Sequence, residues 1–321
     1  MTGSEPAPLQ LLDDQAVAAL LPVRDPRAHK GDNGRVLLLA GSLAYAGAGL
    51  LASHAAGRAG AGLVTLAVPR SLQPVVAGRY VEVITLGLPE RAPWEADPAA
   101  SLAALQAVPH DALVVGPGLL RSDATDALVL ALLGTEGAPA IVDAEALNAL
   151  SRTEGWASRV RRHCVLTPHP GEFRRLRPDE TGDLSADDDA RERAAREAAT
   201  AWGQVVLLKG ARTVVAEPGG EAARAPFENP ALGTGGTGDV LSGIIGALLG
   251  QGLEPYAAAR VGAYLHGAAG EVVRERLGEG GLLASDLPSE VAHARHRLAR
   301  VRDRRAGSAR RLGFAMRSDT A

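Results

Sequence analysis

The residues best suited to chemistry lie in the segment 229–245, where a glycine- and threonine-rich loop leads into an apolar helix. Glycines allow the backbone to approach a ligand closely and tolerate positive φ. The helix that follows directs unpaired N–H groups and the positive end of its dipole at the loop. The pattern therefore predicts a phosphate loop at Gly235, Gly236 and Thr237.

Asp239 stands at the junction between this loop and the helix. A carboxylate repels phosphate, so its presence indicates a group that takes a proton or faces a hydroxyl during phosphoryl transfer. The alternative is an ordinary helix N-cap, a position that favours Asp. A cap alone does not account for four glycines and two threonines in the six residues before it. We therefore interpret Asp239 as a catalytic residue.

A second reactive group is His169, which two prolines hold in an extended segment beside Glu172. A rigidly held histidine next to a carboxylate suits substrate contact or proton transfer. The alternative is that His169 caps the helix that follows it. No protein-built metal centre is expected, because no second His or Cys stands at ligand spacing and Cys164 is the only cysteine.

A third group joins two apolar runs, VVLL and TVVA. It consists of Lys209, Gly210, Ala211, Arg212 and Thr213. Basic side chains and backbone groups at such a tight turn can hold the phosphate or ribose of a nucleotide. The alternative is a β-hairpin with a solvated tip.

These groups need a scaffold, and apolar runs alternating with Ala- and Leu-rich segments provide one. The expected strands are residues 35–40, 63–68, 81–86, 112–115, 140–142, 163–166 and 204–208. The expected helices include residues 48–59, 124–133 and 186–202, the last with a weak capping box of Ser185 and Asp188. The alternation indicates a three-layer α/β/α sandwich around a mostly parallel sheet. The carboxyl ends of its strands would gather the reactive groups at one edge, with Asp143 among them.

Composition narrows the class of protein. With 321 residues, 46% hydrophobic and 22% charged, the chain reads as globular. A net charge of −3 and only 3% aromatic residues give no basis for binding nucleic acid or an anionic membrane. No apolar run approaches the ~18 residues of a membrane span, and the N-terminus lacks the pattern of a signal peptide. We therefore expect a cytoplasmic location.

Together the motifs resemble those of the ADP-dependent NAD(P)H-hydrate dehydratases, the carbohydrate-kinase-like branch of the ribokinase-like superfamily. The resemblance covers about residues 25–290. Its motifs, in order, are HKGDNGRVLLLAGS, YAGA, RAGAGLVTLAVP, GPGL, VDAEALNAL, LTPHPGEF, LLKGART, GTGGTGDVLSGIIGALL, LHGAAGE and LLASDLP. GTGGTGD marks the superfamily alone, whereas HKGxxG, TPHPGE and KGxRT together with it mark the dehydratases.

The resemblance implies a ribokinase-like fold and a repair reaction. The damaged cofactors NADHX and NADPHX, in their S form, are dehydrated to NADH and NADPH while ADP becomes AMP and phosphate. The implied hydrate-binding residues are Ala48, Gly118, His169 and Asp239, with Asp239 as the base. The implied nucleotide-binding residues are Lys209, Gly210, Ala211, Arg212, Thr213 and Gly238.

The resemblance also implies Mg²⁺ bridging the nucleotide phosphates with few protein ligands, and a homotetramer. Many relatives carry an N-terminal epimerase domain, which this chain starts too late to contain, so a separate epimerase would act in the same pathway. We expect an N-terminal extension over residues 1–24, a dehydratase domain over 25–294 and a basic C-terminal tail over 295–321. That tail is interpreted as a solvated helix with a frayed end, or alternatively as a polyanion-binding segment.

Two other functions compete with the dehydratase. A ribokinase-like kinase of a small hydroxylated metabolite, such as a vitamin precursor, would need Asp239 and the glycine loop but not TPHPGE. A nucleotide-sensing or scaffold protein on a retired kinase fold would need none of the reactive groups. The presence of Asp239, Lys209 and His169 argues against that last alternative.

Overall fold

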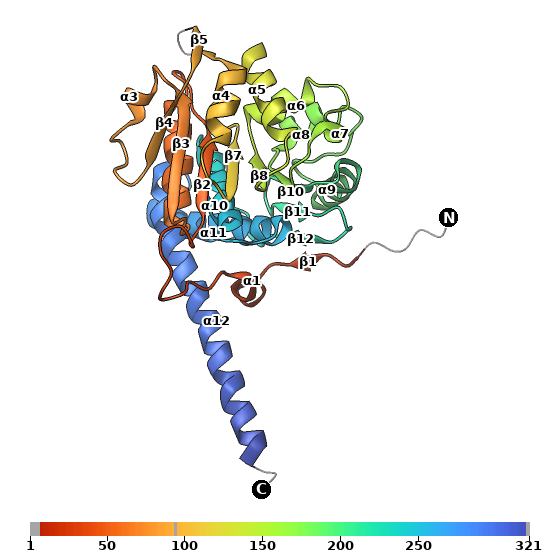
Figure 1. Cartoon of the computed structure of the whole chain (residues 1–321). Coiled ribbons are helices and arrows are strands. Elements are labelled where there is room, and N and C mark those ends of the chain that lie inside the picture. The colour runs from red at the N-terminus through yellow and green to blue at the C-terminus, as the bar shows by residue number, and fades with distance from the viewer. Residues whose placement is uncertain (1–6, 93–94, 319–321) are drawn as a thin grey trace.

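The structure, a computed structural model, describes residues 7–92 and 95–318, with the side chains of 306–318 left aside. Its centre is a large sheet of short strands (Figure 1). In spatial order the strands are β1 (Gln10–Leu11), β12 (Ala222–Arg224), β11 (Val214–Ala216), β10 (Val205–Leu208), β9 (Cys164–Leu166), β8 (Ala140–Val142), β7 (Ala112–Val115), β2 (Arg35–Leu39), β3 (Leu63–Pro69) and β4 (Ile84–Leu88). Among these strands β11 alone runs antiparallel to its neighbours. The mostly parallel sheet expected from the sequence is confirmed.

The strands form where the sequence has continuous apolar runs, because both faces of the sheet are covered. All four residues of β7 and all three of β8 are buried. The strand expected at residues 81–86 instead begins at Ile84, because Val83 closes a turn by donating to the Tyr80 carbonyl. A separate small hairpin pairs β5 (Glu90–Ala92) with β6 (Glu95–Ala96).

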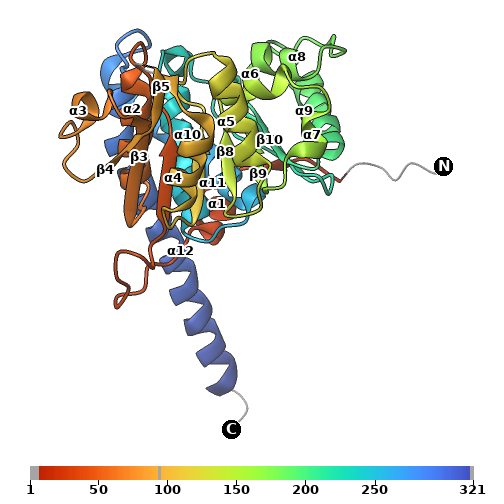
Figure 2. The same ribbon diagram turned by 45° about the horizontal axis from the view of Figure 1, so that its top comes forward.

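Helices cover both faces of the sheet (Figure 2). The first layer contains α1 (Asp14–Leu20), α2 (Ala46–Arg58), α10 (Thr237–Gly250), α11 (Pro255–Leu277) and α12 (Leu287–Ser318). The opposite layer contains α4 (Pro98–Gln106), α5 (Asp123–Leu133), α6 (Glu145–Ser151), α7 (Trp156–Arg159), α8 (Pro170–Leu176) and α9 (Asp188–Trp202). Shorter turns are α3 (Gln73–Val76), η1 (Pro230–Gly233) and η2 (Ala284–Asp286). The three-layer α/β/α sandwich is confirmed.

The expected helices at residues 48–59, 124–133 and 186–202 correspond to α2, α5 and α9. The capping box expected of Ser185 and Asp188 is wrong. Asp187 caps α9 instead, because its carboxylate accepts from the backbone N–H groups of Asp189 and Ala190.

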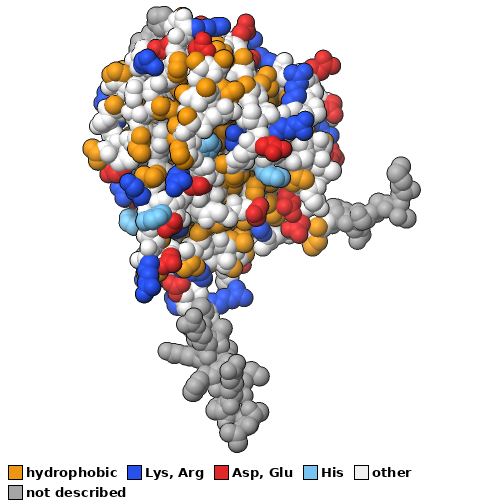
Figure 3. Space-filling view, viewed as in Figure 1, with side chains coloured by type: hydrophobic (Ala, Val, Ile, Leu, Met, Phe, Trp, Pro, Cys, Tyr) orange, Lys and Arg blue, Asp and Glu red, His pale blue; other side chains and the backbone are white. Residues whose placement is uncertain are grey.

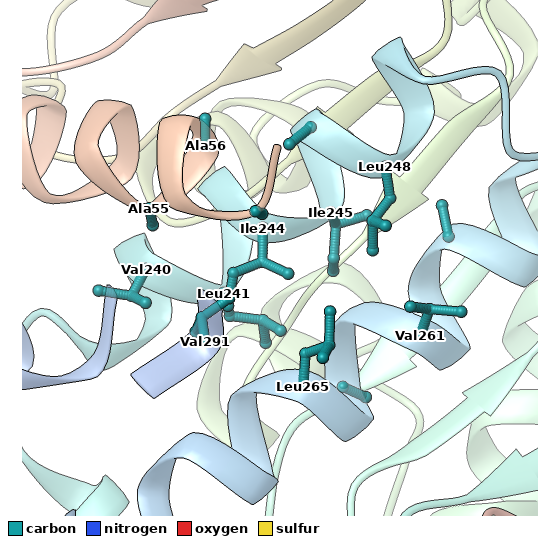
Figure 4. Packing of buried hydrophobic residues seen from close by; sticks show 14 of the residues in the cluster. Ala55, Ala56, Val240, Leu241, Ile244, Ile245, Leu248, Val261, Leu265 and Val291 are labelled. Atoms are coloured by element: carbon teal, nitrogen blue, oxygen red, sulfur yellow. The ribbon is translucent and has the colours of Figure 1, made fainter. Parts of the chain in front are cut away.

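The helix that follows the glycine-rich loop, α10, is the centre of the main core (Figure 4). Its residues Val240, Ile244 and Leu248 are fully buried among α2, α11 and α12. Two glycines permit this close packing. A Cβ on Gly243 would lie 2.0 Å from the Ala52 carbonyl oxygen of α2, so the two helices touch through backbone. A Cβ on Gly246 would lie 2.5 Å from the Val114 side chain, so α10 also packs closely against β7 of the sheet.

The first two elements of the described chain, β1 and α1, pack onto the sheet and the first helical layer. The short strand β1 extends the sheet beside β12, and Tyr264 of α11 donates to the Asp14 carboxylate of α1. The proposed boundary between residues 294 and 295 falls inside α12, where Leu298 is fully buried. The C-terminal part of α12 extends away from the body of the molecule (Figures 1 and 2).

Charge on the surface is mixed. On the face seen in Figure 1, acidic and basic side chains are interspersed around apolar ones (Figure 3). None of the helices in the described part of the chain combines the length and apolar composition of a membrane span.

Candidate active site

The glycine-rich loop ends at Gly236, the N-cap of α10, which has φ of 92°. Thr237 is the first residue of the helix, and its hydroxyl donates to the carbonyls of Leu232 (2.8 Å) and Thr234 (3.0 Å). That hydroxyl therefore holds the loop closed. The Thr237 N–H also donates to the Thr234 carbonyl (3.4 Å), so the N-terminus of α10 offers an anion the N–H groups after Thr237. Asp239 lies inside this first turn, so the alternative that it is an ordinary N-cap is wrong.

Asp239 has an unusual electrostatic environment. Burial and the neighbouring Asp143 carboxylate raise its pKa to about 7, although Lys209 acts in the opposite direction. A carboxylate with such a pKa exchanges protons near neutral pH, where an ordinary aspartate is fully ionised. The position thus suits a general base at the mouth of an anion site.

Lys209, at the end of β10, sits among carboxylates. Its Nζ lies 2.8 Å from Asp143 Oδ1 and 3.7 Å from Glu172 Oε2. Burial alone would lower the pKa of this ammonium group, but Asp143 and Glu172 together raise it. Lys209 therefore stays charged. It lies beside the loop, since a Cβ on Gly238 would be only 3.6 Å from Nζ.

Asp143 is the residue whose role the sequence reasoning did not assign. It follows β8 and is 2% exposed, and its second carboxylate oxygen accepts from the Ser242 hydroxyl of α10 at 2.7 Å. One buried carboxylate thereby joins three elements: β8, the end of β10 and α10. Its place at a strand end within VDAEALNAL was the available signal.

His266 of α11 is a second residue that was missed. Its Nε2 lies 2.9 Å from the Thr237 carbonyl oxygen, so it supports the first residue of α10. Burial lowers the pKa of His266 to about 4, which keeps the ring neutral. The signal was its position in the LHGAAGE motif.

His169 is both a helix cap and a cleft residue. Its Nδ1 accepts from the backbone N–H groups of Gly171 (3.0 Å) and Glu172 (3.3 Å) at the start of α8. The neutral ring must then carry its proton on Nε2, which is 3.5 Å from Glu172 Oε1. Burial lowers the pKa of His169 and Glu172 partly opposes this. The side chain is half exposed and lines the cleft, so a ligand can reach Nε2–H in competition with Glu172.

Residues 209–213 form the tip of the antiparallel β10–β11 hairpin, as the alternative interpretation required. The same tip lines the cleft through Lys209, Gly210, Ala211 and Thr213, and nucleotide binding by this segment stays a prediction. Arg212 adopts a left-handed φ of 54°, and its guanidinium pairs with Asp188 and Glu228 at 3.3 Å each. Its side chain is thus directed to the rim.

Ala48 and Gly118 lie next to each other at the carboxyl ends of β2 and β7. Gly118 has φ of 66°, and a Cβ there would be 2.6 Å from the Ala48 Cβ and 2.7 Å from the Tyr45 carbonyl oxygen. Leu51, one turn beyond Ala48 on α2, reaches the loop, because a Cβ on Gly236 would lie 2.8 Å from its side chain. Leu51 therefore borders the phosphate loop, whereas neither Ala48 nor Gly118 is among the residues that line the cleft described below.

The cleft between the hairpin tip and the loop has a volume of about 790 Å³. The sequence-predicted residues that line it are His169, Lys209, Gly210, Ala211, Thr213, Gly236, Thr237, Gly238 and Asp239. Its remaining wall comes largely from the segment after β12 and from α11, including Phe227, Leu232 and Gly267. A volume of this order suits a nucleotide-sized ligand. Within the residues described here, no group of three or more His, Cys, Asp or Glu is placed to hold a metal ion.

The sheet order and this loop-to-helix site define a ribokinase-like protein. A solved ribokinase-like superfamily protein from Enterococcus faecalis shares the fold, with a TM-score of 0.75 at 22% identity over 91% of this chain and 96% of that one. Residues 36–292 match the Carb_kinase family, described as NAD(P)H-hydrate dehydratase, and the chain belongs to this family.

Similar proteins have informative names. The chain is 45% identical over 268 residues to the bifunctional NAD(P)H-hydrate repair enzyme Nnr of Moorella thermoacetica, covering 83% of this chain and 50% of that protein. It is 36% identical over 281 residues to the ADP-dependent (S)-NAD(P)H-hydrate dehydratase of Xanthomonas campestris, covering 87% and 94%. The ADP/ATP-dependent NAD(P)H-hydrate dehydratase of Bacillus subtilis, co-crystallised with ATP and Mg²⁺, has a TM-score of 0.77 at 31% identity over 90% and 99%. The chain spans about half the length of the bifunctional relatives.

Proposed function

We propose that this chain is a hydro-lyase that dehydrates the S form of NADHX and NADPHX to NADH and NADPH, converting ADP to AMP and phosphate. The observation that carries the proposal is Asp239 in the first turn of α10, with a pKa of about 7, in a cleft lined by the predicted nucleotide residues. Family membership and the names of the relatives support the same chemistry.

The reaction needs a better leaving group than hydroxide. Asp239 takes the proton of the ring hydroxyl as its oxygen attacks the β-phosphorus of ADP, and the bond to AMP breaks. The C–O bond of the phosphorylated ring then breaks as the ring nitrogen supplies electrons, and phosphate departs. Loss of a proton from the neighbouring ring carbon restores the double bond of NADH.

The cleft residues have separate tasks in this scheme. The helix N-terminus and the ammonium of Lys209 stabilise the charge of the transferring phosphoryl group. The loop residues 209–213 hold the AMP part. His169, through Nε2–H, together with Ala48 and Gly118, holds the hydrated cofactor. Mg²⁺ is expected to arrive bound to the nucleotide phosphates, which demands few protein ligands.

The test is to incubate the purified chain with NADHX, ADP and Mg²⁺ and to follow the return of NADH absorbance, with ATP in parallel. We expect NADH to form with the wild type. The Asp239→Asn variant should lose about 10³-fold or more of this rate, in line with removal of a general base, while calorimetry still detects ADP binding. Wild type that forms no NADH would reject the dehydratase; phosphorylation of a small hydroxylated metabolite would then favour the kinase alternative. Normal turnover by Asp239→Asn would reject the assigned base.

We also propose a homotetramer, a cytoplasmic location and an NAD(P)HX epimerase that acts in the same pathway. The exposed edge strand β4 supports self-association, because Val81 and Ile84 near it are 87% and 50% exposed. Light scattering on the purified chain measures the assembly directly; a monomer at all concentrations would reject the tetramer.

A further inference from the structure

Arg191 is a charged residue inside α9 with only 1% of its surface exposed. A buried guanidinium is costly unless its donors find acceptors. Its polar partners belong to the segment just before α9, to Asp188 of α9 and to the β10–β11 hairpin tip. The partners show what the buried charge is used for.

One acceptor lies in the segment before α9, and the other lies in the hairpin tip that carries the predicted nucleotide residues. Nη1 donates to the Leu184 carbonyl at 2.6 Å, and Nη2 donates to the Ala211 carbonyl at 2.7 Å. A Cβ on Gly210 would lie 3.0 Å from Nη1, so the guanidinium packs directly beneath the Gly210–Ala211 peptide. The same peptide lines the cleft on its other side.

Asp188, one turn earlier on α9, extends this contact to a side chain. It pairs with Arg191 through Oδ1 and with Arg212 through Oδ2, the latter at 3.3 Å. The buried arginine and its carboxylate partner thereby fix both the backbone of residue 211 and the guanidinium of residue 212. The hairpin tip is tied to α9 at two adjacent residues.

A hairpin tip joined only by its own turn would sample several conformations, and a ligand that binds it would have to order it. We propose that Arg191 is a positioning residue that preorganises the Gly210–Ala211 segment for the nucleotide. This inference rests on the proposed function, because it takes the loop 209–213 to contact ADP. Arg191 itself does not touch the cleft; it acts through the Ala211 carbonyl.

A matched control is available in the same chain. Arg162 is also buried, at 4% exposure, and it donates to the carbonyls of Leu132 and Ala138 at 2.9 Å each. These contacts lie before β8, at the amino ends of the strands, opposite the cleft. Loss of Arg162 should reduce stability as loss of Arg191 does, but it should leave the nucleotide site intact.

The experiment compares Arg191→Met, Arg191→Lys and Arg162→Met. For each variant, calorimetry gives the Kd for ADP, kinetics give separate KM values for ADP and for NADHX, and thermal melting gives Tm. We expect Arg191→Met to weaken ADP binding by about tenfold and to raise the KM for ADP in parallel, while the KM for NADHX stays within about twofold. Arg191→Lys, which can still reach one carbonyl, should recover part of the ADP affinity. Arg162→Met should lower Tm and leave the Kd for ADP within about twofold.

The outcomes separate this inference from the function itself. An unchanged ADP Kd in both Arg191 variants, or an equal loss of ADP affinity in Arg162→Met, would overturn the positioning role. If Arg191→Met does not fold, Arg191→Lys alone tests the positioning role. An ADP affinity of Arg191→Lys equal to that of the wild type would then refute this role. Wild type that binds ADP but forms no NADH would reject the dehydratase and leave the Arg191 comparison valid. Wild type that binds neither ADP nor ATP would overturn the inference.

Discussion

Three carboxylates, Asp143, Glu172 and Asp239, surround the single ammonium group of Lys209 next to the phosphate loop. Such a cluster carries excess negative charge before any ligand arrives, and the least paired member is the one that holds its proton most tightly. Asp143 is engaged by Lys209 and Ser242, which leaves Asp239 to carry the raised pKa. The raised pKa of the proposed base therefore comes first from burial and then from the Asp143 carboxylate, which lines the same cleft.

The first prediction concerns pH. Asp239 must be ionised to accept a proton, and its pKa of about 7 lies far above the ordinary value, so kcat/KM for NADHX should rise as pH increases through 7 and level off above it. The Asp143→Asn variant removes the like charge and releases Lys209 toward Asp239. Both changes lower the pKa of Asp239, so the midpoint should move to lower pH.

The control is Asp126→Asn. Asp126 lies on α5, and its carboxylate pairs with Arg152. That variant should keep the wild-type midpoint. A pH profile measured from 5 to 9, within the range in which such groups titrate, distinguishes the variants. A midpoint that moves to higher pH in Asp143→Asn would contradict the electrostatic assignment.

The second prediction separates the two roles of His169. His169→Asn keeps an N-cap at the start of α8, because Asn is a favoured capping residue, but it removes the imidazole Nε2–H. His169→Ala removes both. We expect both variants to raise the KM for NADHX by about tenfold or more, the cost of one lost hydrogen bond to a ligand, with the KM for ADP nearly unchanged.

Only His169→Ala should also lower Tm, since only it removes the cap. Steady-state kinetics with each substrate varied in turn provide the measurement, and thermal melts provide the control. An equal rise in the KM for ADP would place His169 elsewhere in the cleft.

At the scale of elements, the sequence predicted well wherever local signals decide the structure. The runs 112–115 and 140–142 became β7 and β8 without any change of boundary, because a continuous apolar run has few other solutions in a covered sheet. The glycine loop and its helix were likewise predictable from the local sequence pattern. The strand expected at 81–86 was displaced because a turn at Tyr80 closes first.

What local signals could not predict are contacts between distant elements. Ser242 lies 99 residues from the Asp143 carboxylate that it binds, and Arg191 lies 20 residues from the Ala211 carbonyl. Nothing within α9 marks Arg191 among its neighbouring arginines as the buried one. Such pairs depend on how β8, β10 and the helices are placed in three dimensions. The sequence therefore predicted many of the residues that line the cleft, including Lys209 and Asp239, but it assigned no role to Asp143 and missed His266, which line it too.

The third prediction tests how α10 is seated. Gly243→Ala places a Cβ 2.0 Å from the Ala52 carbonyl oxygen, so α10 must move away from α2. We expect a loss of about 1–3 kcal/mol, seen as a fall of several degrees in Tm. The phosphate loop moves with the helix, so ADP affinity should fall as well.

Gly57→Ala on α2 is the matched control. A Cβ there meets no atom within 4 Å, and the position is helical and exposed. Because Ala is preferred over Gly in a helix by roughly 0.5–1 kcal/mol, this variant should melt at or above the wild-type Tm. A Gly243→Ala variant as stable as Gly57→Ala would be incompatible with backbone contact between α2 and α10.

At the scale of the whole molecule, the first part of α12 packs back onto the segments that follow α1, α2 and α10. Arg302 of α12 donates to the Leu21 and Pro22 carbonyls that follow α1, and Arg295 reaches Gln251 at the end of α10 and the Ala59 carbonyl after α2. Burial lowers the pKa of Arg295 to about 10, so the guanidinium is still charged at neutral pH. The first half of α12 thus completes the helical layer that holds α10 in place.

The last prediction follows from this packing of α12. If residues 295–301 belong to the packed body, Leu298→Ala should cost about 2–5 kcal/mol, the usual cost of truncating a fully buried leucine, because Leu298 is 0% exposed in the same core as α10. Arg300→Ala, two residues further along the same helix and exposed, should change stability by less than about 0.5 kcal/mol. Urea unfolding followed by circular dichroism gives both values. Equal stability of the two variants would mean that the tail proposed to begin at residue 295 is separate from the core. A large loss confined to Leu298→Ala would mean that the tail begins after residue 298.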